Sequence, residues 1–274
     1  MTIQDALAQG TKLLDDDNTA APRLTAEVLL GHALHRDRVW LYAHGDEELS
    51  EIGWIHYGRY LHERLNGKPT QYITGRQEFY GREFRVNPAV LIPRPETEHV
   101  VEAALAVLRP GMTVVDVGCG SGAIAVTLAL ESQDRVIATD ISFEALQVAR
   151  DNARRLGARV EFVAGDLIAP LHRADMIVSN PPYVPRTDRT VLQREVRDYE
   201  PSVALFAGDT GLEIYERLIA DSPRVLTNGG HLILELGFKL AGPVRAMLGE
   251  GWSDVRVIPD LAGIPRVLVA QWKA

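Results

Sequence analysis

The sequence contains four consecutive residues whose side chains and backbone could hold an NH2 group in one orientation: Asn180, Pro181, Pro182 and Tyr183. The two prolines restrict the backbone, so the Asn180 side-chain oxygen and the Pro181 carbonyl can be fixed acceptors for both N–H bonds, with the Tyr183 ring over the planar face. A carboxamide nitrogen is a poor nucleophile, and this grip favours the tetrahedral nitrogen of an in-line displacement. The tetrapeptide therefore predicts group transfer to an amino or amide nitrogen. The alternative is a rigid turn that only closes a strand.

A glycine-rich turn between a predicted strand and a predicted helix could hold a ligand. It consists of Gly118, Cys119, Gly120, Ser121 and Gly122. Glycines permit a tight turn and let a ligand approach the backbone, so we expect these residues to contact a nucleotide-type ligand. Asp140 follows the next predicted strand, 22 residues after Gly118, close to the offset of about 20 residues at which a carboxylate accepts hydrogen bonds from ribose hydroxyls.

The acidic residues near this turn distinguish two kinds of cofactor. The turn fits the G-x-G-x-x-G/A pattern, so a dinucleotide and S-adenosylmethionine are both candidates. Asp116, just before the turn, would repel a pyrophosphate but suits the cationic amino-acid end of S-adenosylmethionine, which we therefore predict. Asp166, after the third predicted strand, could accept from the adenine amine. Both aspartates could instead be ordinary turn or capping carboxylates.

Predicted strands and helices alternate over residues 89–274. This alternation would position the glycine turn, the aspartates and the Asn180 turn. Seven β-rich runs cover residues 113–117, 135–139, 160–164, 176–179, 231–235, 254–258 and 266–271. The alternation predicts a parallel sheet covered by helices on both faces, with the Asn180 turn at its carboxyl edge. The last two runs are separated by too few residues for a parallel crossover, so this pair is predicted to be antiparallel.

The first part of the chain has a different pattern. Residues 1–75 show helical spacing of apolar side chains and are predicted to form a helical bundle. Thr2 and Asp5 form a capping-box pair before the first helix, and Pro22 begins the second. Residues 76–88 alternate in polarity and are predicted to be a β-hairpin linker. The chain is thus expected to comprise a helical domain, a hairpin and a catalytic domain.

Composition excludes several classes of protein. The net charge, 29 − 37 = −8, argues against broad nucleic-acid binding. Cys119 is the only cysteine, and neither a signal peptide nor a membrane span is evident, so a cytoplasmic location is expected. Five histidines lie in the helical part without clustered cysteines or carboxylates, so no metal site is predicted.

These residues resemble the bacterial protein-(glutamine-N5) methyltransferases that modify peptide chain release factors. The most specific matching stretch is Pro93-Arg94-Pro95-Glu96-Thr97-Glu98. The other matches are residues 69–75, Phe79, Gly81, Phe84, residues 91–92, the glycine turn, residues 180–183, 200–201 and 204–205, Asp209 and residues 211–212. The resemblance implies a class I S-adenosylmethionine-dependent methyltransferase. Such a protein has a Rossmann-like, mostly parallel seven-stranded sheet with an antiparallel last strand, here joined to an N-terminal helical bundle.

The resemblance also implies roles for individual residues. Gly118 to Gly122, Asp140, Leu167 and Asn180 would contact S-adenosylmethionine, and Asn180 to Tyr183 would grip the substrate glutamine. In this family the glutamine lies in the Gly-Gly-Gln loop of a release factor, its methylation modulates translation termination, and the helical domain helps to dock the protein substrate. The chain departs from the family at Leu167, often aromatic, and by lacking the Gln that usually follows the motif at Glu235-Leu236-Gly237.

Two other functions are compatible with parts of the pattern. Adenine-N6 methylation of DNA could use the same tetrapeptide. Residues 1–88, however, carry 10 Lys or Arg against 13 Asp or Glu, and residues 89–274 carry 19 against 24. Neither half has the cation excess that phosphate contacts need. A non-catalytic binding module, with the sheet as a scaffold only, is the other alternative.

Overall fold

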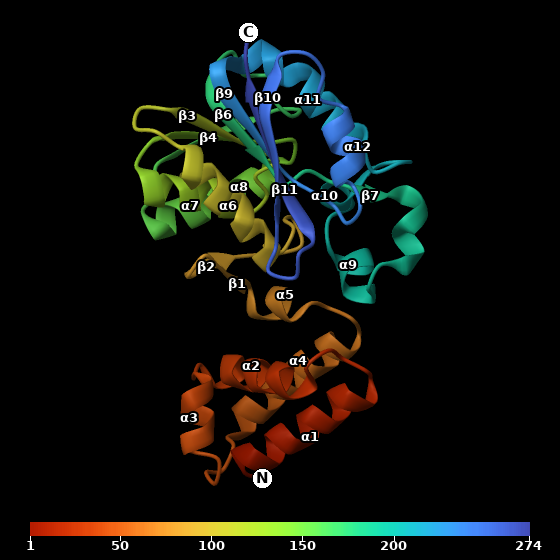
Figure 1. The fold of residues 1–274 in the computed structure, drawn as a ribbon. Coiled ribbons are helices and arrows are strands. Elements are labelled where there is room, and N and C mark those ends of the chain that lie inside the picture. Colours follow the sequence, from red (N-terminus) through yellow and green to blue (C-terminus); the bar gives the residue numbers. More distant parts are fainter. The chain divides into compact units, whose positions relative to one another are not determined.

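The computed structural model describes all residues from Met1 to Ala274 and divides into two compact units (Figure 1). The first unit comprises Met1–Arg76 and Gln193–Tyr199, and the second comprises Gln77–Leu192 and Glu200–Ala274. The short segment Gln193–Tyr199 thus belongs to the first unit, although it lies within the part of the sequence assigned to the catalytic domain. None of the helices has both the length and the apolar character needed to cross a bilayer.

The first unit is a bundle of helices, as the apolar spacing predicts. Its helices are α1 (Ile3–Asp16), α2 (Pro22–Leu34), α3 (Arg38–Ala43), α4 (Glu51–Leu65), α5 (Thr70–Thr74) and, from the distant segment, α9 (Arg194–Tyr199). Thr2 and Asp5 form the predicted capping box, with hydrogen bonds of 3.0 and 3.1 Å that satisfy two free amides of α1. The bundle buries Leu14, Leu29 and Tyr57.

The expected hairpin is present and, apart from Arg76, belongs to the second unit. Strands β1 (Arg76–Phe79) and β2 (Arg82–Arg85) form a two-stranded sheet, and the buried rings of Phe79 and Phe84 join the core of that unit. Asn152 of α8 (Phe143–Leu156) holds the hairpin, since its amide exchanges two hydrogen bonds with the Arg85 backbone.

The second unit contains the predicted seven-stranded sheet. Its strands are β3 (Thr113–Val117), β4 (Arg135–Asp140), β5 (Val160–Ala164), β6 (Ala174–Ser179), β9 (Leu226–Glu235), β10 (Trp252–Pro259) and β11 (Pro265–Trp272). The spatial order is β10-β11-β9-β6-β3-β4-β5. β11 is antiparallel to both neighbours and lies between β9 and β10, which confirms the antiparallel last strand. The remaining pairs are parallel.

Helices cover both faces of this sheet (Figure 1). One face carries α6 (Glu98–Val107), α7 (Ala123–Ser132) and α8, and the other carries α11 (Glu213–Val225) and α12 (Ala241–Ala246). Successive strand residues point to opposite faces, so Val114 packs into the first core and Val115 into the second. The 3-10 turn η1 (Pro95–Thr97) directly precedes α6.

The connection from β6 to α11 holds small elements that the sequence pattern does not predict. They are β7 (Val184–Pro185), the 3-10 helix η2 (Arg186–Val191), α9, α10 (Ser202–Leu205) and β8 (Phe206–Gly208). β7 and β8 pair in parallel, and this brings Val203 back toward the end of β6.

Candidate active site

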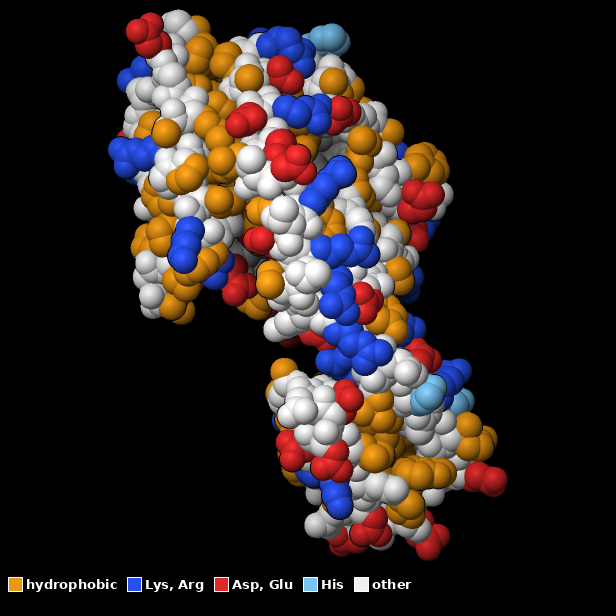
Figure 2. Space-filling model, turned by 90° about the vertical axis from the view of Figure 1, so that its right-hand side faces the viewer, with side chains coloured by type: hydrophobic (Ala, Val, Ile, Leu, Met, Phe, Trp, Pro, Cys, Tyr) orange, Lys and Arg blue, Asp and Glu red, His pale blue; other side chains and the backbone are white.

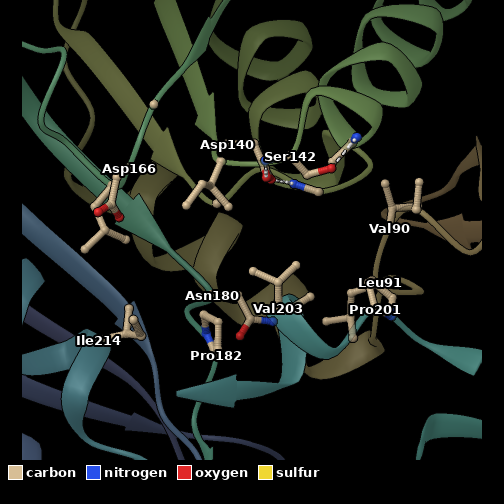
Figure 3. A pocket seen from close by; sticks show the side chains of 18 of the residues that line it. Val90, Leu91, Asp140, Ser142, Asp166, Asn180, Pro182, Pro201, Val203 and Ile214 are labelled. Atoms are coloured by element: carbon tan, nitrogen blue, oxygen red, sulfur yellow. Dashed lines mark hydrogen bonds between the residues drawn. The ribbon is translucent and has the colours of Figure 1, made fainter. Parts of the chain in front are cut away.

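One pocket opens at the carboxyl edge of the sheet, where β3, β4 and β6 end. It is lined by Ala89, Val90, Leu91, Gly118, Gly120, Asp140, Ile141, Ser142, Ala145, Gly165, Asp166, Leu167, Asn180, Pro182, Pro201, Val203, Ala204, Ile214 and Arg217. Figure 3 shows Asp140 and Ser142 across the open space from Asn180 and Pro182. Parallel strands end at one edge, so the three predicted segments meet although they lie far apart in the sequence.

The glycine turn leaves its backbone open to this pocket. Gly118, Gly120 and Gly122 have φ angles of 71, 53 and 81°, a region that other residues rarely adopt. The amides of Gly118 and Cys119 both donate to the Thr139 carbonyl at 2.9 Å, which anchors the turn to β4. A Cβ atom built at Gly118 or Gly120 would have no neighbour within 4 Å, so this surface can accept a ligand.

Three members of the turn do not line the pocket. Cys119 and Ser121 are buried, and Gly122 lies against α8, where an added Cβ would be 3.1 Å from the Ala149 Cβ. Gly122 therefore provides close packing of the turn on the helix. The predicted cofactor contacts of these three residues stay predictions.

Asp140 organises the pocket wall through both carboxylate oxygens. Oδ2 accepts from the Gly120 amide at 2.9 Å, and Oδ1 accepts from the Ser142 amide at 2.8 Å. Burial raises the pKa of Asp140 above its usual value, because the charged form loses hydration. Each carboxylate oxygen can accept more than one hydrogen bond, so Asp140 can also accept from the two hydroxyls of a ribose.

Asp116 is fully enclosed and does not line the pocket. Its Oδ2 accepts from the Ala125 amide in the first turn of α7 at 3.0 Å, whereas Oδ1 has no hydrogen-bond partner. Burial raises the pKa of Asp116 to about 7. The observed bond is that of a carboxylate at a helix N-terminus, and the unpaired Oδ1 fits a cationic neighbour. Its contact with the cofactor stays a prediction.

Asp166 and Leu167 line the pocket beside α11. Asp166 accepts from Arg217 at 2.6 Å, and sequence reasoning did not identify this arginine. Leu167 has a φ of 51°, and its carbonyl accepts from the Thr139 hydroxyl at 3.0 Å. The turn thus directs the Leu167 side chain to an apolar wall that also includes Ile214.

Only two of the four residues of the Asn180 turn lie at the pocket. Asn180 and Pro182 line the pocket, whereas Pro181 and Tyr183 do not. The Tyr183 ring packs against Gly237, where an added Cβ would be 2.8 Å from the ring. Burial raises the pKa of Tyr183 to about 12, so its phenol is neutral at physiological pH. The Asn180 Nδ2 donates to the Thr97 hydroxyl at 3.1 Å.

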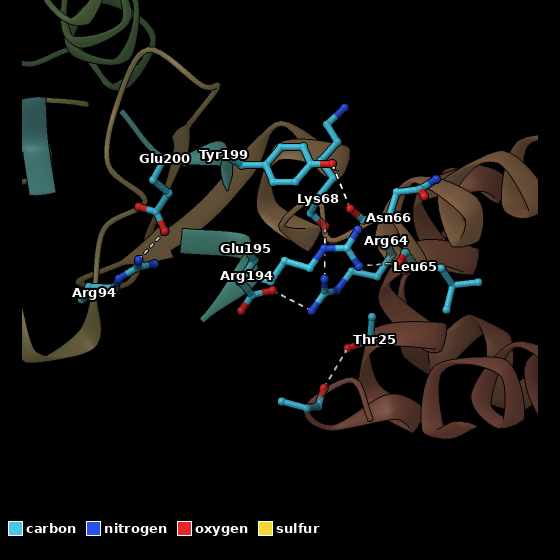
Figure 4. Close-up of polar contacts among 11 residues, drawn as sticks. Thr25, Arg64, Leu65, Asn66, Lys68, Arg94, Arg194, Glu195, Tyr199 and Glu200 are labelled. Carbon is cyan, nitrogen blue, oxygen red and sulfur yellow. Dashed lines mark hydrogen bonds and ion pairs between the residues drawn. The ribbon is translucent and has the colours of Figure 1, made fainter. Parts of the chain in front are cut away.

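An ion pair between a partly exposed arginine and a buried glutamate supports the part of the pocket wall formed by Leu91 and Pro201. Arg94 pairs with Glu200, whose carboxylate also accepts from the Ile92 amide at 3.3 Å (Figure 4). These partners flank Leu91 and Pro201, which line the pocket. Two of the stretches that carried the resemblance are therefore in contact, although neither was singled out as part of the site.

Replacing Arg94 with alanine should destabilise the second unit and weaken ligand binding in the pocket. The Glu200 side chain is 1% exposed and would lose this cation, and because the Arg94 side chain is 34% exposed the cost is about 1–3 kcal/mol in unfolding free energy. Arg135→Ala is the control, because Arg135 forms an exposed pair with Glu161 that water screens, so its loss should change the unfolding free energy little. Chemical denaturation measures the unfolding free energy of both variants. Equal losses of unfolding free energy would contradict the role of the Arg94–Glu200 pair.

The comparisons with known proteins agree with this architecture. The PrmC N-terminal domain model matches residues 5–75, and the methyltransferase small domain model matches residues 99–198. The release factor glutamine methyltransferase of Koribacter versatilis is 46% identical and covers 99% of each chain. That of Neisseria gonorrhoeae is 47% identical over 92% of this chain and 94% of its own.

A solved structure shows the same fold. The methyltransferase from Pyrococcus furiosus has a TM-score of 0.55 at 21% identity, and the match covers 79% of this chain and all of that one. Together with the near full-length relatives, this shows that the chain belongs to the release factor glutamine methyltransferases, a family of S-adenosylmethionine-dependent enzymes.

Proposed function

We propose that this chain transfers a methyl group from S-adenosylmethionine to the side-chain amide nitrogen of the glutamine in the Gly-Gly-Gln loop of peptide chain release factors. The methylation would modulate translation termination. The observation that carries the proposal is the Asn180 amide, which lines the same pocket as the glycine turn and Asp140. The names of the relatives point to the same substrate.

The pocket residues match the parts of the donor. The open backbone at Gly118 and Gly120 would receive its amino-acid end, and Asp140 would accept from the ribose hydroxyls. Asp166 would accept from the adenine amine, between the apolar side chains of Leu167 and Ile214. When bound, the donor supplies an electrophilic methyl group on a positively charged sulfur.

The Asn180 turn would hold the acceptor nitrogen. The Asn180 Oδ1 would accept one of its N–H bonds, and the backbone carbonyl of the buried Pro181 would accept the other. Together they would direct the nitrogen lone pair along the line of displacement. Positive charge develops on this nitrogen during transfer, so the two acceptors bind the transition state more strongly than the ground state. The proton can leave after transfer, and no general base is needed beforehand.

Surfaces outside the pocket would bind the rest of the protein substrate. A second hollow, lined by Arg186, Arg189, Ser202, Val203 and Phe206, shares Val203 with the donor pocket. In the helical unit, Val39, Tyr42, Ile52 and Ile55 are exposed hydrophobic side chains on α3 and α4. We assign these four residues, which lie within the first 75 of the chain, to docking of the release factor, because exposed apolar side chains favour protein partners.

Charge favours a protein over DNA as the substrate. Figure 2 shows Lys and Arg side chains mixed with Asp and Glu over the upper part of the larger unit, and several Lys and Arg side chains in a short row lower on the same face. The net charge is −8, so phosphate binding would have to overcome general repulsion. A cytoplasmic location, where release factors work, belongs to the same proposal.

The direct test supplies the chain with labelled S-adenosylmethionine and either a release factor or duplex DNA. We expect label in the release factor only, and mass spectrometry should find a single methyl group on the Gly-Gly-Gln glutamine. A release factor in which this glutamine is replaced is the control. Label in DNA alone, or on another release factor residue, would contradict the proposal.

A further inference from the structure

The Asn180 side-chain amide is the first member of a chain of two hydrogen bonds that leads away from the pocket. Its Nδ2 donates to Oγ1 of Thr97 over 3.1 Å, and that Oγ1 donates to Oε2 of Glu235 over 2.6 Å. Thr97 ends η1 and Glu235 ends β9, so the chain of bonds joins three segments far apart in the sequence. Thr97 and Glu235 are 5% and 2% exposed, respectively, and neither lines the pocket.

The direction of these hydrogen bonds determines which end of the Asn180 amide is free. An ionised Glu235 only accepts, so the single hydroxyl proton of Thr97 goes to Glu235, and Thr97 can then only accept from Asn180. Asn180 must therefore present its NH2 to Thr97, which leaves Oδ1 free. A rotated amide would occupy the same volume but would place its oxygen against the Thr97 oxygen.

We propose that Thr97 and Glu235 are positioning residues that keep the Asn180 side-chain oxygen available to the substrate NH2 group. This rests on the proposed function, because an NH2 substrate needs an acceptor at that place. Thr97 is the N-cap residue of α6, but its hydroxyl makes no hydrogen bond to that helix. The hydroxyl instead bonds to Asn180 and Glu235.

The protonation of Glu235 should control this orientation. Burial raises the pKa of Glu235 to about 7. A protonated Glu235 can donate to Thr97, which frees the Thr97 proton for the Asn180 oxygen and removes the constraint on the amide. We therefore expect kcat to rise with pH through about 7. The other titratable groups near Glu235 are Arg94, Glu96, Tyr183, Tyr215 and Arg266.

Three variants separate positioning from packing. Thr97→Val keeps the shape and removes the hydroxyl, Thr97→Ser keeps the hydroxyl, and Glu235→Gln can donate to Thr97 and so reverse the hydrogen bonds. We expect kcat to fall on the order of tenfold to a hundredfold in Thr97→Val and Glu235→Gln, with little change in donor Kd. Thr97→Ser should retain most activity, and Thr97→Val should lose the rise of kcat with pH. Equal losses in Thr97→Val and Thr97→Ser would indicate packing and overturn the proposal.

A second measurement does not depend on turnover. The side-chain NH2 signals of Asn180 in a nitrogen-15 spectrum, assigned by their loss in Asn180→Ala, report its hydrogen bond directly. They should shift in Thr97→Val and Glu235→Gln and stay close to wild type in Thr97→Ser. Unshifted signals would overturn the positioning role. If the signals shift in these two variants but the wild-type chain methylates no release factor, the positioning role is supported and only the proposed function is contradicted.

Discussion

Replacing Asn180 with alanine is expected to lower the kcat of methyl transfer by two orders of magnitude or more, while donor binding stays largely intact. The variant removes one of the two acceptors that stabilise the developing positive charge on the substrate nitrogen, and loss of one such preorganised group costs about 10²–10³ in rate. The donor would keep its contacts with Gly118, Gly120 and Asp140. Single-turnover kinetics at saturating donor, with calorimetric titration of the donor, measures both effects.

Asn180→Gln is the matched control for this experiment. It keeps the carboxamide but lengthens the side chain by one methylene, so the oxygen is displaced from the position it has in Asn180. We expect a comparable loss of kcat, because positioning depends on sub-ångström geometry. If Asn180→Ala retained wild-type kcat, the holding mechanism would be wrong. If the donor Kd alone changed, Asn180 would be a donor-binding residue.

Replacing Asp140 with alanine should have the opposite signature, with donor binding weakened about a hundredfold or more and kcat at saturating donor close to wild type. A hydrogen bond to a charged group contributes about 1.5–3 kcal/mol, and Asp140 would make such bonds to the ribose. The change also releases the amides of Gly120 and Ser142, which the carboxylate fixes. Calorimetric titration of the donor measures the change in Kd.

Asp134→Ala is the control for the loss of one acidic group. Asp134 accepts from the Gly111 amide and is not part of the pocket, so donor affinity should stay at the wild-type value. A variant at Asp140 that lowers kcat without changing donor Kd would exclude the assignment of this carboxylate to the ribose.

The sequence by itself determined the local structure and the chemical classes of the site. Thr2 and Asp5 specify a helix start within four residues, and the glycine turn and the Asn180 turn specify backbone shapes through their own residue types. The alternation of strands and helices then predicts the parallel sheet, which brings Gly118, Asp140 and Asn180 to one edge. These features depend on residues close together in the chain, so their pattern is readable in the sequence.

Only the tertiary structure decided how those groups are supported. Thr97 and Asn180 are 83 positions apart, and Arg94 and Glu200 are 106 apart, so no local pattern pairs them. The insertion of β11 between β9 and β10, and the inclusion of Gln193–Tyr199 in the helical unit, are likewise outcomes of global packing. The physical reason is that a buried polar group takes whichever partner the folded chain places within hydrogen-bond distance, and that partner is fixed by the order of the strands rather than by neighbours in the sequence.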